Sequence, residues 1–215
     1  MTTVACDRPT SVTKSLLGYG VIAGPFYFIV SLAQALTRDG FDLTRHEWSL
    51  LANGSLGWVQ IANFILTGAM VLAFAVGLRR ALRSKVAWLI GVFGVGLIGG
   101  GVFRADPALG FPPGTPDGPG AVSWHGLLHF VCAGVGFLCL IVACLTLARR
   151  FAAEGDRRWA AFSAVTGVAF LAAFAGVATG TGGAAGTAVI FAFIAAVALA
   201  FGWIAALAVR LYRNA

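Results

Sequence analysis

Charged residues are scarce in this chain, and acidic residues are scarcer than basic ones. Asp, Glu, Lys and Arg make up 11% of the 215 residues, whereas 59% are hydrophobic. A soluble domain usually carries about 25% charged residues. The composition therefore excludes an ordinary soluble domain, and at this length we expect one membrane domain with no soluble module beside it.

Cysteine is also rare and gives no sign of a metal or redox site. Of the four cysteines, Cys6 stands alone, whereas Cys132, Cys139 and Cys144 fall within one apolar run. No pair has the spacing of metal ligands, and thiols in apolar helices mostly act as inert packing groups. We expect these cysteines to be structural.

The chain consists largely of six long apolar runs. Each is long enough, or nearly so, to cross a hydrocarbon core of about 30 Å as a helix. The first contains Ala33-Gln34-Ala35, which resembles a signal-peptide cleavage site, but a run of about 20 residues exceeds a typical signal core. We predict an all-α integral membrane six-helix bundle, one domain over residues 1–215. The expected spans are 16–36, 56–78, 86–103, 126–148, 160–180 and 186–209.

Basic residues follow every second apolar run. Such alternation is typical of the positive-inside rule and predicts that both termini lie in the cytoplasm, in a multi-pass protein of the inner (plasma) membrane. The net charge of +7 is then an orientation signal, and nucleic acid is not an expected partner. The basic residues concerned are Arg79, Arg80, Arg83, Lys85, Arg149, Arg150, Arg157, Arg158, Arg210 and Arg213.

Two long connections lie on the predicted outer side. Residues 37–55 are polar, and we expect them to be partly helical near Arg45–Leu51. Residues 104–124 are so rich in proline and glycine that we expect irregular structure, and a long irregular loop in a compact domain is often functional. The third outer connection, residues 181–185, is predicted to be a tight turn. Within the third run, Gly96 and Gly100 favour close contact with another helix.

All three histidines and most of the acids fall on this outer side. His125 and His129 are four residues apart, so on a helix they share one face, and His129 lies about one turn into its span. Gln60, Asn63 and Thr67 form a polar stripe that begins at the same depth. We predict an outward-opening cavity in which Gln60 and Asn63 face His129. We expect Arg104 and Asp106 at its rim, because Pro107 ends the third helix there.

Three interpretations of this cluster are open. In the first, the buried polar groups are bonded for structural reasons alone. In the second, a histidine and a carboxylate form an acid–base site at a partly desolvated depth. In the third, His125, His129 and His46 bind a metal with an acid, although only two of these ligands have a fixed spacing. We expect no metal and no cofactor.

Several short motifs resemble a known family. They are Arg45-His46-xx-Ser49 followed by Gly57-Trp58, an Arg-x-Asp-Pro loop after the third run, and a histidine opening the fourth. Together with six spans, they are similar to the bacterial and archaeal membrane family called domain of unknown function 998. The resemblance implies a six-helix membrane protein of unestablished activity, with Arg45, His46, Ser49, Asp106 and His129 among the marked positions.

Function is predicted in three forms. The first is a membrane-embedded enzyme that acts on an apolar, lipid-like or isoprenoid-like small molecule by acid-initiated cyclisation, isomerisation or hydrolysis. The second is a non-catalytic protein that binds a membrane lipid or another ligand. The third, a transporter, is less favoured because no charged residue lies at mid-membrane.

In the enzyme hypothesis, two sets of residues act. The predicted catalytic residues are Asp106, His129, Glu47 and His46. The predicted substrate-binding residues are Arg104, Arg45, Gln60, Asn63, His125, Trp58 and Trp124.

Overall fold

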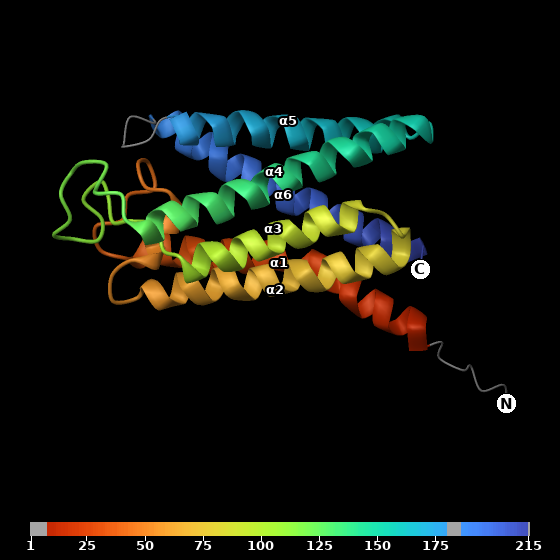
Figure 1. The fold of residues 1–215 in the computed structure, drawn as a ribbon, viewed down its shortest axis with the longest axis horizontal. Coiled ribbons are helices and arrows are strands. Elements are labelled where there is room, and N and C mark those ends of the chain that lie inside the picture. The colour runs from red at the N-terminus through yellow and green to blue at the C-terminus, as the bar shows by residue number, and fades with distance from the viewer. Residues whose placement is uncertain (1–7, 180–185, 215) are drawn as a thin grey trace.

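The computed structural model describes residues 8–179 and 186–214, so the connection predicted over residues 181–185 lies outside the described residues. Over these ranges the chain forms six α-helices and one short 3₁₀ helix, η1, and contains no β-strand (Figure 1). The elements are α1 (Arg8–Thr37), η1 (Trp48–Ala52), α2 (Gly57–Leu82), α3 (Val86–Val102), α4 (Trp124–Ala153), α5 (Arg157–Thr179) and α6 (Thr187–Asn214).

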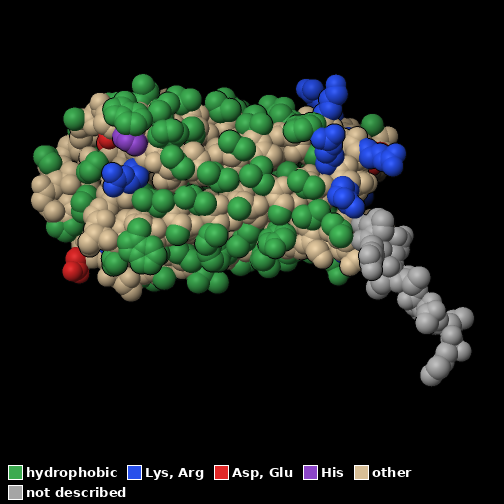
Figure 2. Space-filling model, turned by 60° about the horizontal axis from the view of Figure 1, so that its bottom comes forward, with side chains coloured by type: hydrophobic (Ala, Val, Ile, Leu, Met, Phe, Trp, Pro, Cys, Tyr) green, Lys and Arg blue, Asp and Glu red, His purple; other side chains and the backbone are tan. Residues whose placement is uncertain are grey.

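The predicted all-α six-helix bundle is confirmed. Five helices are long and apolar enough to cross a membrane, whereas α3 is apolar but has only 17 residues. At 1.5 Å per residue, α3 spans roughly 25 Å. On the face drawn in Figure 2, hydrophobic side chains cover the length of the molecule, and most of the visible Lys and Arg side chains gather at one end. The chain is therefore a multi-pass membrane protein.

The helices follow one another around the bundle in chain order, and α6 closes the ring against α1 (Figure 1). The start of α1, the end of α6 and the short α2–α3 and α4–α5 connections lie at one end, which we call the basic end. The connections 38–56 and 103–123 lie at the opposite end, which we call the capped end. The polar residues predicted as a site therefore belong mainly to the capped end.

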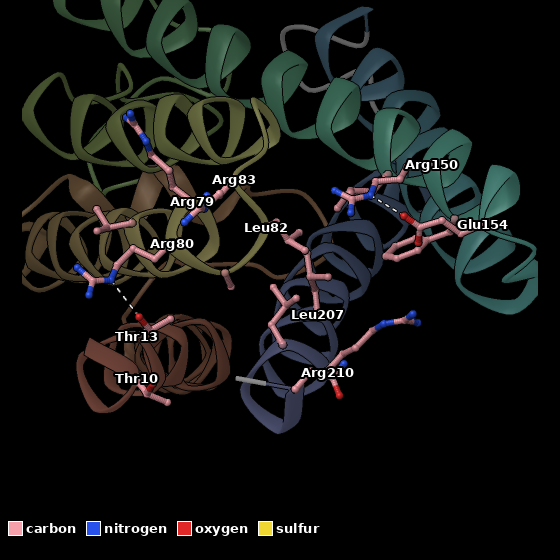
Figure 3. A pocket seen from close by; sticks show the side chains of 16 residues that line it. Thr10, Thr13, Arg79, Arg80, Leu82, Arg83, Arg150, Glu154, Leu207 and Arg210 are labelled. Carbon is pink, nitrogen blue, oxygen red and sulfur yellow. Dashed lines mark hydrogen bonds and ion pairs between the residues drawn. The ribbon is translucent and has the colours of Figure 1, made fainter. Parts of the chain in front are cut away.

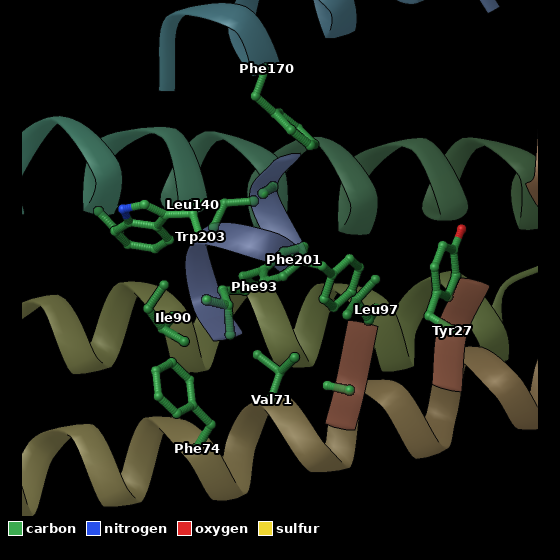
Figure 4. Packing of buried hydrophobic residues seen from close by; sticks show 14 of the residues in the cluster. Tyr27, Val71, Phe74, Ile90, Phe93, Leu97, Leu140, Phe170, Phe201 and Trp203 are labelled. Atoms are coloured by element: carbon green, nitrogen blue, oxygen red, sulfur yellow. The ribbon is translucent and has the colours of Figure 1, made fainter. Parts of the chain in front are cut away.

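Helix α6 supplies much of the buried core. Phe201 stacks on Tyr27 of α1 with ring centroids 5.5 Å apart and lies 6.1 Å from Phe93 of α3 (Figure 4). Trp203 is fully buried, and its indole N–H donates to Ser163 Oγ of α5 at 2.9 Å. Such close packing and interhelical hydrogen bonding stabilise helix association in a membrane, where burial of apolar groups from water contributes little.

Glycine allows α3 and α4 to approach closely, as predicted for Gly96. A Cβ atom on Gly96 would lie 2.7 Å from Cys132 O and 2.9 Å from Gly136 Cα, both in the α4 backbone. Gly100 faces the ring of His129, whose Cε1 would lie 3.6 Å from an added Cβ. The close contact between α3 and α4 thus depends on the absence of a side chain at Gly96. This contact positions His129 beside the end of α3.

Candidate functional site

The capped end is built from the two long loops, and His46 joins them. Its Nδ1 accepts the backbone N–H of Asp42 at 2.9 Å, and its Nε2 lies 3.0 Å from Leu109 O. The carbonyl can only accept, so Nε2 carries the proton and the ring is neutral. His46 is 2% exposed. Both nitrogens are therefore used to hold one loop against the other.

Arg38 and Asn53, which the sequence analysis did not select, stabilise the same cap. The Arg38 guanidinium donates to the carbonyls of Leu51 and Asn53 and lies 5.0 Å from the centre of the Phe111 ring. Asn53 Nδ2 donates to Ala105 O at 3.0 Å across the two loops. The expected helical segment of the first loop is present as η1, and the second loop is irregular as predicted.

Asp106 lies at the start of α4. Its carboxylate accepts the backbone N–H of Ser123 at 2.8 Å and the Ser123 hydroxyl at 2.5 Å, and Ser123 Oγ in turn accepts Gly126 N–H. A Cβ on Gly126 would lie 2.0 Å from Asp106 Oδ2. A carboxylate at a helix N-terminus also interacts favourably with the helix dipole. Ser123 is therefore the N-cap residue of α4, Asp106 holds it in place, and the absence of a side chain at Gly126 leaves space for the Asp106 carboxylate.

His129 is buried and lies one turn further along α4. Its Nδ1 contacts the carbonyls of Gly100 and Phe103, at 3.0 and 2.9 Å, at the end of α3. Because both partners are acceptors, Nδ1 carries the proton. Nε2 has no hydrogen-bond partner among the described residues and presents a lone pair.

The predicted position of Gln60 and Asn63 across a cavity from His129 is wrong. These residues face α1: Gln60 Oε1 accepts from Gln34 Nε2 at 2.8 Å, and Asn63 Nδ2 donates to Ser31 Oγ at 2.9 Å. The α2 side chain that faces His129 is Phe64, whose ring centre lies 6.4 Å from that of the histidine, so the two polar faces do not meet. Ser31 and Gln34, three residues apart on α1, were the sequence signal for this partnership. The result is a buried hydrogen-bonded seam between α1 and α2, with Thr67 donating to Asn63.

The remaining predicted residues spread over the cap and its rim. Arg45 forms an exposed ion pair with Asp117 across the two loops at 3.7 Å. Burial raises the pKa of the Glu47 carboxyl above its usual range, and its neighbour Trp48 inserts against Phe28 of α1. Arg104 is exposed.

The aromatic residues of the rim lie at the ends of α2 and α4. Trp58 and Trp124 are both exposed, as expected of side chains at a membrane interface. The ring centre of His125 lies 3.6 Å from that of Trp124, and its buried Nδ1 has no hydrogen-bond partner among the described residues. Within residues 8–179 and 186–214, no three His, Cys, Asp or Glu side chains gather as metal ligands would.

A second candidate site, which the sequence analysis interpreted only as an orientation signal, lies at the basic end. A cavity of about 1000 Å³ opens between the ends of α1, α2, α4 and α6 (Figure 3). Leu82 and Leu207 lie in its centre, and Leu147 and Phe151 contribute further apolar surface. Among the described residues, its charged lining residues are five arginines and one glutamate, a formal charge of +4: Arg79, Arg80, Arg83, Arg150, Arg210 and Glu154.

The arginines of this cavity differ in their partners. Arg150 Nε donates to Glu154 Oε1 at 2.8 Å, and Arg210 Nη1 donates to Asp156 Oδ2 at 2.7 Å. Arg210 holds the pKa of Asp156 below its usual range. Arg79 lies over the ring of Trp88, 4.6 Å from its centre. Arg83 forms no ion pair with a described residue and has a left-handed backbone with φ of 47°.

These features define a multi-pass helical membrane protein with a rigid polar cap at one end and an arginine-lined cavity at the other. The family described as "Protein of unknown function (DUF998)" matches residues 21–210. The chain belongs to this family, as its motifs indicated. No curated protein and no solved structure matches the chain.

Proposed function

We propose that this protein binds an anionic amphiphile of the membrane in the cavity at its basic end. The observation that carries the proposal is the meeting of five arginines with leucine and phenylalanine around a cavity of about 1000 Å³. Guanidinium groups bind anionic head groups through paired hydrogen bonds, and the apolar lining suits the adjoining hydrocarbon. The volume lies at the upper end of the range of about 300–1000 Å³ that is usual for ligand pockets.

The position of the cavity favours a lipid over a soluble ligand. Its arginines stand at the ends of apolar helices, at the depth where lipid head groups meet water. Applied to these basic connections, the positive-inside rule assigns the cavity to the cytoplasmic leaflet of the plasma (inner) membrane. The partner proposed here is therefore a membrane lipid.

Arg83 provides the sharpest test, because its left-handed backbone suits asparagine better than arginine. Arg83→Asn removes one charge from the cavity without disfavouring the turn. Arg149→Asn removes the same charge from α4 outside the cavity lining and serves as the matched control. Native mass spectrometry of the full chain would measure bound phosphatidylglycerol and phosphatidylcholine.

We expect the wild type and Arg149→Asn to retain phosphatidylglycerol in preference to phosphatidylcholine, and Arg83→Asn to lose about tenfold in affinity for the anionic lipid, the equivalent of one good charged contact. Equal retention of both lipids by the wild type, or equal effects of the two variants, would contradict the proposal.

An acid–base enzyme acting on a lipid-like or isoprenoid-like substrate at the capped end is the second candidate. The observation that favours it is the His129 ring, whose Nδ1–H is fixed by carbonyls while its Nε2 keeps a lone pair. A histidine held in one tautomer in this way can accept a proton from a substrate. Glu47, protonated more readily than an exposed glutamate, is the candidate proton donor.

His129→Asn tests this second function. The asparagine amide can still donate to the carbonyls of Gly100 and Phe103, but it has no counterpart of Nε2. Lipid extracts from cells that produce the wild type or the variant would be compared by mass spectrometry. Loss of a product by a variant of normal thermal stability supports catalysis, whereas identical lipid profiles oppose it.

A further inference from the structure

We infer that the cap formed by the two long loops is a pH-sensitive switch: the neutral ring of His46 holds the loops together, and uptake of a second proton by this ring releases them. The inference concerns the capped end and is independent of the lipid proposed at the basic end. It depends on the direction of the two hydrogen bonds of His46, on the burial of its ring and on the nature of the neighbouring contacts.

The hydrogen bonds of His46 require a neutral ring. Nδ1 accepts the backbone N–H of Asp42 at 2.9 Å, and Nε2 donates to the carbonyl of Leu109 at 3.0 Å. A second proton would have to be added at Nδ1, where it would face the N–H of Asp42, and two donors form no hydrogen bond with each other. Separation of the two donors moves the ring, and with it the Nε2–H group that joins Leu109.

The ring of His46 is enclosed by the two loops. It is 2% exposed, and its centre lies 5.2 Å from that of the Phe41 ring and 5.6 Å from that of the Phe111 ring. A buried charged group whose donors lack acceptors is costly, so an imidazolium at this position is stabilised by contact with water. Water reaches Nδ1 only when the loops separate. Proton uptake is thereby coupled to opening of the cap.

The charged groups around His46 belong to three segments of the chain. They are the carboxylates of Asp42 and Glu47 and the guanidinium of Arg45 in the same loop, Asp117 in the second loop, and Arg38 at the end of α1. The acids favour an imidazolium and the arginines oppose it. Because Arg45 and Asp117 form an ion pair with each other, their effects on His46 largely offset.

The two acids of the same loop can be distinguished from His46 by their titration. The Asp42 carboxylate accepts the hydroxyl and the N–H of Thr44, which hold its pKa below its usual range, so it stays charged between pH 5.5 and pH 7.5. Burial raises the pKa of the Glu47 carboxyl. Protonation of Glu47 therefore stabilises the folded loop as the pH falls, which is opposite in sign to the effect expected of His46.

The neighbouring contacts confine the release to the outer part of the cap. Asn53 joins the loops close to the helices through a hydrogen bond that does not titrate. Further out, the exposed ion pair of Arg45 with Asp117 contributes at most about 1 kcal/mol. Loss of the His46 bonds should therefore separate residues 39–47 from residues 107–118 and leave η1 and the helices in place.

The direction of the switch follows from the state of the ring. The closed cap holds neutral His46, whereas an exposed histidine gains a proton near pH 6.5. The closed cap is therefore stable above this pH and loses stability as the pH falls below it. If only the open cap takes up the proton, the ratio of open to closed cap rises about tenfold from pH 7.5 to pH 5.5. The positive-inside rule assigns the capped end to the outside, so the switch would respond to acid in the external medium.

Hydrogen exchange of the full chain in phosphatidylcholine nanodiscs, measured by mass spectrometry at pH 7.5 and pH 5.5, tests the switch. Exchange rates are expressed relative to those of unstructured peptides at the same pH. We expect the protection of amides in residues 39–47 and 107–118 to fall about tenfold at pH 5.5, because the open cap becomes more populated by this factor. The amides of η1 and α2 should keep their protection.

Three variants assign the effect to one residue. In His46→Asn, the side-chain oxygen still accepts from Asp42 N–H but does not titrate, so the protection should be lower at pH 7.5 and should not change with pH. His46→Gln keeps a donor for Leu109 O in place of the acceptor and carries the same expectation if His46→Asn does not fold. His125→Asn removes another histidine of the capped end and is the matched control, which should keep the pH dependence of the wild type.

Three results would overturn the inference. The first is equal protection of the wild-type loops at both pH values. The second is protection that rises at pH 5.5, which would mean that Glu47 and not His46 governs the loops. The third is a tenfold fall that persists in the folded His46 variant or disappears in His125→Asn.

Discussion

At the scale of single residues, the polar groups of the capped end are mostly engaged with backbone. His46 and Asn53 join the two loops, and Asp106 holds Ser123, the N-cap residue of α4. Such hydrogen bonds stabilise a fold whatever else the residues do, because an unpaired buried polar group costs about 1–3 kcal/mol. This supports the structural interpretation for most of the cluster. Among the described histidine nitrogens, Nε2 of His129 and Nδ1 of His125 have no hydrogen-bond partner.

Asp106→Ala should lower the free energy of unfolding by about 1–2 kcal/mol, because Ser123, the N-cap residue of α4, loses the carboxylate that positions it. The variant removes the acceptor of Ser123 N–H and O–H at the start of α4. Denaturant unfolding in detergent, followed by circular dichroism, would measure the change. Asp117→Ala is the control, because it breaks only the exposed ion pair with Arg45, and it should lower the free energy of unfolding by less. Equal losses in the two variants would contradict the capping role.

Glu47 should make the stability depend on pH. Its pKa is raised in the folded protein by burial, so the folded state binds the proton more strongly than the unfolded state does. The stabilisation by the protonated form is present at low pH and is lost as the pH rises above the usual value of 4.5 towards the raised one. Glu47→Gln should therefore become more stable than the wild type between pH 4 and pH 7. Thermal unfolding across this range measures the difference in stability between Glu47→Gln and the wild type. A difference that does not change with pH would contradict the prediction.

At the scale of elements, the contact between α3 and α4 leaves no space for a side chain at Gly96. Gly96→Ala would force the new Cβ against the backbone of α4, which cannot rotate away, and should cost about 1–3 kcal/mol. Gly202→Ala on α6 meets nothing within 4 Å and is the matched control, expected to be neutral or slightly stabilising. Unfolding curves of the two variants compare them directly. If the two variants had the same free energy of unfolding, α3 and α4 would be packed less closely at Gly96 than the structure shows.

At the scale of the whole molecule, both ends of the described chain lie at the basic end (Figure 1). Reporter fusions after Arg80, Arg150 and Arg213 should therefore all report the cytoplasm, and a fusion after Asp117 should report the outside. The physical reason is the retention of arginine-rich connections on the cytoplasmic side. One clear external signal from the first three fusions would reverse the assignment of the cavity to the inner leaflet.

The sequence predicted the six helices well because membrane helices satisfy their backbone hydrogen bonds internally, so length and hydropathy suffice. The sequence did not predict which polar side chains of different helices form hydrogen bonds with one another. The partner of Gln60 is Gln34, which had been noticed only as part of a cleavage-like tripeptide. The cavity at the basic end was missed for another reason. Arg79 lies in the last turn of α2 and Arg83 directly follows this helix, but only the three-dimensional bundle brings Arg150 and Arg210 to the same cavity.

The absence of a side chain at position 126 has a consequence for the evolution of the family. Any larger residue there would overlap the carboxylate of Asp106, which lies 20 residues earlier in the chain. The two positions must therefore change together. In relatives that carry alanine or a larger residue at the position of Gly126, we expect a residue smaller than aspartate at the position of Asp106, with the start of α4 capped by Ser123 alone. An alignment of the family would reveal this as a covarying pair, and relatives that combine aspartate with a larger residue would refute it.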